Sequence, residues 1–149
     1  MTAVALRPYV QADEDAAIEL WRRTWAQHYP HIDFAKRVDW WRARWRQELV
    51  PTAIVSVAEL DDQMVGFVTV DPKNGYLDQI VVAPEVWGSE VANLLMAEAR
   101  RISPNGLDLK VNADNTRAIR FYEKQGFIDA DATVNETSGA PVRLMRWRP

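Results

Sequence analysis

The chain has 149 residues, of which 48% are hydrophobic, with no cysteine and a formal net charge of -3. This length and composition indicate one ordinary globular domain over 1–149, and the lack of cysteine excludes disulfides and thiolate-bound metal. The mildly acidic balance, without a basic tail, argues against nucleic acid as the main partner. No apolar run has the form of a secretory signal or reaches the roughly 20 residues of a membrane span, so we expect a cytoplasmic protein with no membrane contact.

The N-terminal third predicts one strand and two helices. Ala3 to Tyr9 has the pattern of a short strand, and Asp13 to Tyr29 that of a helix which Pro30 ends. A second helix is expected over Phe34 to Leu49. Both helices contain tryptophans four residues apart, which predicts that each buries one aromatic face.

The middle of the chain changes to the period of two that is typical of strands. Ala53 to Leu60 and Met64 to Val70 are separated by a short polar segment and predict a hairpin. The turn signal Asn74-Gly75 precedes a third strand, Tyr76 to Val82. Its three final apolar residues suggest burial on both faces and therefore a central place in the sheet.

The last third predicts a helix, a strand, a helix and a closing hairpin. Asn115 is a suitable N-cap, and Gly126 a suitable C-terminal residue, for the second of these helices. The expected elements are helix Val91 to Ile102 with Val91, Leu94, Leu95 and Ala99 buried, strand Leu107 to Val111, helix Thr116 to Gln125, and strands Phe127 to Val134 and Val142 to Trp147 around the Ser138-Gly139 turn. The whole order is β-α-α-β-β-β-α-β-α-β-β.

Two stretches of the sequence contain motifs that are more specific than the order of elements. Leu77 to Ala92 reads LDQIVVAPEVWGSEVA, and the stretch Asn112 to Phe127 fills every fixed position of N-x-x-A-x-x-F-Y-x-x-x-G-F. With the element order, they make the chain resemble the GNAT superfamily of N-acetyltransferases nearly end to end. The resemblance implies an α/β GNAT fold, in which a mixed central sheet flanked by helices splays at a V-shaped opening between strands Tyr76 to Val82 and Leu107 to Val111. It also implies transfer of an acetyl group from acetyl-CoA to an amine.

The resemblance implies that CoA binds along the central strand, the loop after it and the next helix. A helix N-terminus offers unpaired N–H groups and about half a positive charge, which suit a diphosphate. An exposed strand edge can pair with the amides of an extended pantetheine arm. The residues placed at this site are Ile80, Val81, Val82, Trp87, Gly88, Ser89, Glu90, Val91, Ala92, Asn93, Asn115 and Tyr122.

The loop departs from the family's Q/R-x-x-G-x-G/A pattern at two positions. Trp87 replaces the first residue and Glu90 the first glycine, whereas Ala92 fits. A carboxylate here would oppose phosphate, and its Cβ would hinder close approach of the backbone. Alternatively, Glu90 favours the first turn of the helix and points to solvent while the backbone amides still bind phosphate.

Tyr122 and Asp78 are the catalytic candidates. A tyrosine hydroxyl aimed at the leaving sulfur can act as general acid, whereas the alternative for Tyr122 is a ring in the core with its hydroxyl at the surface. A neutral amine requires a base, and Asp78 on the central strand is the candidate, although alternation does not say which face it takes. Lys110 stands where some relatives have a glutamate.

The tryptophan-rich helices have two interpretations, core packing and an aromatic lid over the acceptor, and packing is the simpler one. Arg42, Arg44 and Arg46 could meet an anionic acceptor, but alternating helical positions usually form a solvated face. His28, His31 and Asp33 are too loosely spaced to indicate a metal, so we expect none.

The leading hypothesis is an acetyl-CoA-dependent N-acetyltransferase that works by direct attack in a ternary complex, since no cysteine can hold the acetyl group. A different hypothesis is a GNAT-fold binding or regulatory protein with weakened CoA use, suggested by Trp87 and Glu90. Transfer of a longer acyl chain is a third. The acceptor is a small-molecule or protein amine, and a homodimer is left open, since exposed tryptophans or a free last strand could support one.

Overall fold

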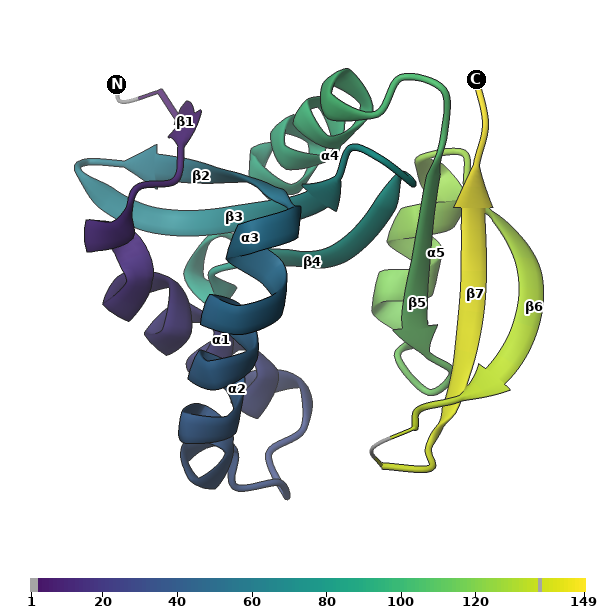
Figure 1. Cartoon of the computed structure of the whole chain (residues 1–149), viewed down its shortest axis with the longest axis horizontal. Coiled ribbons are helices and arrows are strands. Elements are labelled where there is room, and N and C mark those ends of the chain that lie inside the picture. Colours follow the sequence, from purple (N-terminus) through teal and green to yellow (C-terminus); the bar gives the residue numbers. More distant parts are fainter. Residues whose placement is uncertain (1–2, 137) are drawn as a thin grey trace.

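The computed structural model describes residues 3–136 and 138–149. A seven-stranded mixed sheet has the order β1-β2-β3-β4-β5-β7-β6, with β4 in the middle as predicted (Figure 1). The strands are β1 Ala5–Pro8, β2 Ile54–Leu60, β3 Gln63–Asp71, β4 Tyr76–Val82, β5 Leu107–Asn112, β6 Ile128–Val134 and β7 Pro141–Trp147. The helices are α1 Glu14–His28, α2 Val38–Arg44, α3 Val50–Thr52, α4 Val91–Ile102 and α5 Thr116–Lys124.

The sheet consists of two antiparallel parts that meet at one point. Strand β4 pairs with β3 from Asp71↔Tyr76 to Gly66↔Val82. Between β4 and β5, which run parallel, the described residues form one register pair, Tyr76↔Asp108. Beyond it the strands diverge, and Figure 1 shows the β5-β7-β6 unit turned away from β1–β4. The V-shaped opening predicted from the sequence is therefore confirmed.

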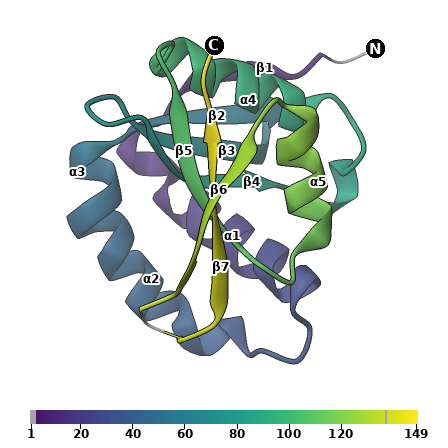
Figure 2. The same cartoon turned by 90° about the vertical axis from the view of Figure 1, so that its right-hand side faces the viewer.

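Helices cover both faces of the first part of the sheet. In Figure 1, α4 lies on one face of β1–β4, and α1 and α2 lie on the other. Figure 2, turned by 90°, shows α2 and α3 on one side of β5 and β7, and α5 on the opposite side. The divergence of β4 and β5 therefore lies between two pairs of helices, α2 and α3 on one side and α4 and α5 on the other.

The tryptophans of α1 and the following helical segment form the core on the α1–α2 face. Trp21 and Trp41 stack with ring centroids 4.7 Å apart, and Trp45 meets Phe67 of β3 edge-on at 5.3 Å. All four are almost fully buried. The indole of Trp45 also donates a hydrogen bond to the Tyr9 hydroxyl at 3.1 Å. The packing interpretation is confirmed for these three tryptophans, whereas Trp25 is half-buried.

The second predicted helix is not continuous. Its segments are a 3₁₀ turn Phe34–Arg37, helix α2, a π-helical turn Trp45–Leu49, and α3. Pro51 has no N–H and its ring crowds the preceding turn, so the ladder cannot continue unchanged. The Val50 N–H reaches five residues back to the Trp45 carbonyl, and Thr52 Oγ1 donates to the Glu48 carbonyl at 2.6 Å.

Smaller differences from the sequence predictions concern where strands end and which side chains are buried. The first strand is shorter than predicted, and the β2–β3 hairpin turns through Asp61 and Asp62 alone, both at positive φ, as in a type I′ turn. Ile80 and Val82 are half-buried, so the prediction that β4 is buried on both faces is wrong at these positions. The reason is that β4 borders the opening, where β5 no longer covers it. Leu94 of α4 is likewise only half-buried.

Candidate active site

The opening leaves one edge of β4 available to a ligand. The β3-facing edge of β4 is paired from Tyr76 to Val82 except at Asp78, where a bulge interrupts the register, and pairing with β5 ends at Tyr76. Ile80, Val81 and Val82 follow beyond this point, where β5 has diverged. Backbone N–H and C=O groups at such an edge can pair with amides of an extended ligand. This geometry fits the pantetheine arm of CoA.

The loop that follows β4 ends at the N-terminus of α4. Gly88 has φ +82°, and a Cβ there would meet no atom within 4 Å. Ser89 Oγ accepts a hydrogen bond from the Val91 N–H at 3.3 Å. Glu90 is the N-cap residue, is exposed, and makes no side-chain capping bond. The open space beside Gly88 and the start of a 12-residue helix suit a phosphate group.

The other residues predicted along α4 lie deeper or farther along the helix. Val91 is buried and Ala92 half-buried. Asn93 Oδ1 accepts a hydrogen bond from Gln125 Nε2 at 2.8 Å, which ties α4 to the end of α5. Val91 therefore contributes packing, while Asn93 helps to fix the two helices that border the cofactor side.

Trp87 is held in place by three contacts. Its Nε1 donates to the Val82 carbonyl at 2.8 Å, the Arg117 guanidinium lies 4.3 Å from its ring centroid, and the His28 ring is 4.9 Å away. Burial, and secondarily the charge of Arg117, lower the pKa of His28. Sequence reasoning missed Arg117 and His28 here, although Arg117 stands in the specific motif itself.

Asn115 and Tyr122 have the places in α5 that the motif predicts. Asn115 Oδ1 accepts from the Ala118 N–H at 3.2 Å, so its capping role is confirmed. Tyr122 is buried, with its ring 5.6 Å from Phe121 and 5.7 Å from Phe127. Burial raises the pKa of the Tyr122 hydroxyl, which keeps it protonated and able to donate.

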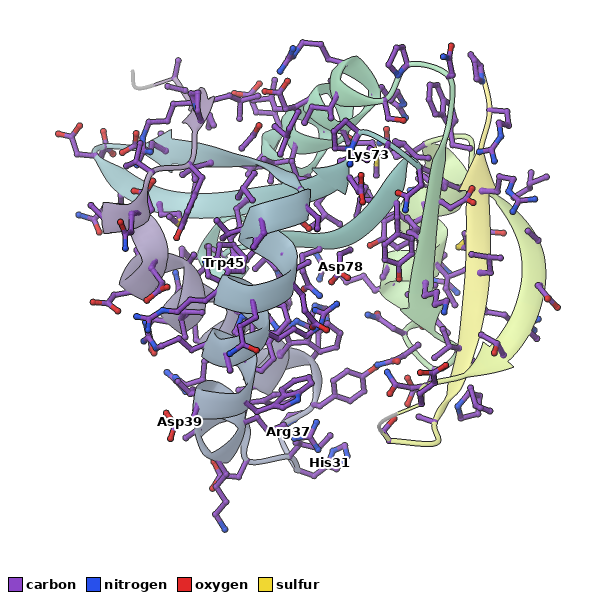
Figure 3. The ribbon with its side chains drawn as sticks, in the orientation of Figure 1. His31, Arg37, Asp39, Trp45, Lys73 and Asp78 are labelled. Carbon is purple, nitrogen blue, oxygen red and sulfur yellow. The ribbon has the colours of Figure 1, made fainter. Side chains whose placement is uncertain are left out.

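Asp78 lines a cavity of about 230 Å³ between β4 and the helical segment that contains Arg44 and Glu48. Figure 3 shows Asp78 between the α2–α3 helices and β5. Tyr76, two residues earlier on β4, lines the same cavity, and burial together with the Asp78 charge raises its pKa to about 12. Tyr76 was missed by sequence reasoning. Its i, i+2 spacing from Asp78 is the signal that could have found it.

Of the three arginines, Arg46 is exposed as the sequence favours, whereas Arg42 and Arg44 are half-buried, and all three pair with carboxylates. Arg42 and Arg46 both bond Glu14 of α1, and Arg44 bonds Asp78. The charges therefore tie this helical segment to its neighbours.

The residues considered for a metal do not come together. In the described part of the chain, no group of three or more His, Cys, Asp or Glu side chains could hold a metal ion. His28 packs against Trp25 and Trp87. At the end of α1, the Tyr29 hydroxyl donates to Asp114 at 2.8 Å and so reaches the segment before α5.

Comparison with known proteins decides the family. The profile of the acetyltransferase (GNAT) family matches residues 14–127. The chain belongs to the GNAT family. It is 30% identical over 133 residues to the peptidyl-lysine N-acetyltransferase YjaB of Salmonella typhimurium, covering 86% of each chain, and 27% identical to the peptidyl-lysine N-acetyltransferase YiaC of Escherichia coli, covering 95% of each.

A solved GNAT structure shares the fold. The PaiA N-acetyltransferase of Thermoplasma acidophilum, in complex with coenzyme A, superposes with a TM-score of 0.75 at 20% identity and covers 99% of both chains. As a GNAT-family member, the protein is an acetyl-CoA-dependent N-acetyltransferase, which confirms the leading hypothesis; the binding or regulatory alternative is not favoured. No helix in the described residues has the length and apolar character needed to cross a membrane.

Proposed function

We propose that this GNAT enzyme acetylates the side-chain amine of lysine in a protein, as a single domain over 1–149. Support for the lysine acceptor comes from the relatives of nearly equal length that are named peptidyl-lysine N-acetyltransferases. Support from the structure comes from the cavity at Asp78, which lies between the start of β4 and the helical segment of Arg44 and Glu48 and, at about 230 Å³, is large enough for an alkylamine side chain.

The two sides of the opening have different tasks in this proposal. On the side of α4 and α5, the β4 edge and the Gly88-Ser89 loop bind acetyl-CoA, which supplies an activated acetyl thioester. On the side of α2 and α3, Asp78 receives the acceptor. Asp78 takes a proton from the ammonium group, because only a neutral amine can attack the carbonyl carbon.

Tyr122 completes the proposed reaction. As the new C–N bond forms and the C–S bond breaks, the departing sulfur gains negative charge. The Tyr122 hydroxyl donates a hydrogen bond to this sulfur, because a tyrosine hydroxyl is protonated at neutral pH. The cofactor contacts at Ile80, Val81, Val82, Trp87, Gly88, Ser89 and Asn115 position the thioester for attack.

The test is to incubate the protein with acetyl-CoA and a lysine peptide. Release of the CoA thiol measures the rate, and mass spectrometry locates the acetyl group. We expect acetylation of the lysine side chain by the wild type. Tyr122→Phe should lower kcat by about 10- to 100-fold with a near-normal Kd for acetyl-CoA, because the hydroxyl acts on the leaving group. Full turnover in Tyr122→Phe would refute the acid role. Binding of acetyl-CoA without acetylation of any lysine peptide would refute the lysine acceptor.

A further inference from the structure

Arg44 lies over the cavity that contains Asp78 and bonds two carboxylates at once. Its Nη1 and Nη2 donate to Asp78 Oδ1 and Oδ2 at 3.0 and 2.5 Å. Its Nε is 3.2 Å from Glu48 Oε2, one helical turn farther along. The guanidinium also lies 5.3 Å from the Trp41 ring centroid. Arg44 is therefore the cation that the free protein holds against its candidate base.

This pairing blocks the base. A bidentate guanidinium occupies the oxygen positions through which a carboxylate would receive an ammonium group. The Asp78 side chain is only 14% exposed, and Gln79 Nε2 donates to Oδ1 at 3.0 Å as well. An ammonium group that takes the place of Arg44 on the two Asp78 oxygens must therefore displace it.

The structure provides a second partner for Arg44. The Glu48 side chain is 64% exposed and already contacts Nε, so Arg44 can stay paired after it releases Asp78. Glu48 belongs to the π-helical turn that begins directly after Arg44. Such wide turns are rare and frequently occur at functional sites.

We propose that Arg44 holds the place of the acceptor's ammonium group at Asp78, and that a binding acceptor displaces it toward Glu48. Arg44 is then a specificity-determining residue. The inference rests on the proposed acetylation of lysine, because it assigns the Asp78 cavity to the acceptor.

The exchange of the Arg44 guanidinium for the acceptor's ammonium group at Asp78 defines the class of acceptor. The cavity is lined by three acidic side chains, Glu48, Asp71 and Asp78, and by one cation, Arg44. An alkylammonium group supplies the positive charge beside Asp78 that is lost when Arg44 moves away. A free α-carboxylate on the same lysine would approach a cavity that is lined by three acidic side chains. The favoured acceptor is therefore a lysine side chain without an adjacent carboxylate.

The test compares two probes, Nα-acetyl-lysine amide and Nα-acetyl-lysine, whose carboxylate is free. In the wild type we expect a lower KM for the amide. Arg44→Gln should lower the KM for the amide about three- to tenfold and change kcat little, because the competing cation is gone. Glu48→Gln should raise this KM, because Arg44 loses its second partner. The control is Arg42→Gln, because Arg42 pairs with Glu14 and Asp15 outside the cavity. The KM of this variant for the amide should equal the wild-type value.

Binding gives a second readout. Calorimetric titration of Nα-acetyl-lysine amide into protein saturated with CoA should show tighter binding to Arg44→Gln and weaker binding to Glu48→Gln. Glu48 is exposed, so its variant decides the question even when Arg44→Gln does not fold. A raised KM in folded Arg44→Gln, or a preference for the free carboxylate, would overturn the inference while leaving lysine acetylation intact. Failure of the wild type to acetylate either probe or any lysine peptide would instead count against the proposed function.

Discussion

Glu90 and Trp87 stand where the family's loop pattern has other residues, and the structure shows how each is placed. Trp87 turns its indole back to the Val82 carbonyl and supports the Arg117 guanidinium on its ring. A cation thus lies beside the loop although the loop itself has none. Glu90 is exposed, and an added Cβ at Gly88 would meet no atom within 4 Å. Neither substitution therefore fills the place where we propose that phosphate binds.

The charge of Glu90 should nevertheless weaken CoA binding. A carboxylate in the first turn of a helix interacts with its N-terminal partial charge by about 0.3–1 kcal/mol, and phosphate competes for the same field. Glu90→Gln and Glu90→Gly should therefore both tighten the Kd of CoA about two- to fivefold in calorimetry at low salt. Glu90→Gln removes the charge alone, whereas Glu90→Gly also changes the freedom of the backbone. An unchanged Kd in both would show that the carboxylate faces away from the ligand.

The residues that we propose for the cofactor side could be named from the sequence because they lie in contiguous motifs. Glycine, small residues and an N-cap at fixed spacing have local physical reasons, and the structure places them at the ends of β4, α4 and α5. Arg44 and Tyr76 were not predicted as site residues. Arg44 meets Asp78 across 34 positions of sequence, and which face Asp78 takes depends on the register of β4 with β3. Neither the pairing of Arg44 with Asp78 nor the face that Asp78 takes can be predicted from a local sequence pattern.

Among the elements, α1 and the helical segment after it are joined by charge as well as by tryptophans. Glu14 near the start of α1 accepts from Arg42 and from Arg46. Helical spacing predicted these arginines to be solvated, because a single helix does not show which partner it will pack against. The carboxyl of Glu14 is 13% exposed, so this pairing is more than a surface contact.

This junction should make stability depend on acidic pH. The hydrogen bond from Arg46, with help from Arg42, lowers the pKa of Glu14 from 4.5 to about 2. A lowered folded-state pKa stabilises the fold above the unfolded value, and this stabilisation disappears as pH falls from 4.5 toward 2. Glu14→Gln should cost about 1–2 kcal/mol of unfolding free energy at pH 7 and much less near pH 2–3, measured by urea denaturation. Asp15→Asn is the control, because the Asp15 side chain is 91% exposed and its pair with Arg42 is worth little. A pH-independent difference would contradict the assignment.

For the whole molecule, the order and type of elements followed from hydrophobic periodicity, but the divergence of β4 and β5 did not. Alternation predicts that each is a strand and says nothing about the distance between them. The opening was predicted only through the resemblance to a family. At its apex the Gly75 carbonyl accepts from the Asp108 N–H at 3.0 Å and pairing stops after Tyr76↔Asp108, just before the bulge of β4 at Asp78.

Gly75 should therefore be critical for the assembly of the two halves. It has φ +75°, and a Cβ there would lie 2.5 Å from the Gly106 carbonyl oxygen and 3.0 Å from Ser103 Oγ. Gly139 has nearly the same φ, +73°, with no atom within 4 Å of an added Cβ. Gly139→Ala should thus cost only about 1 kcal/mol for the left-handed backbone, whereas Gly75→Ala should cost about 2 kcal/mol more, because backbone must move to relieve the contact. Since that movement changes how β5 leaves β4, Gly75→Ala should also raise the KM for acetyl-CoA while Gly139→Ala does not. Equal losses in urea denaturation, with equal KM values, would show that the apex accommodates a side chain and that the opening is held elsewhere.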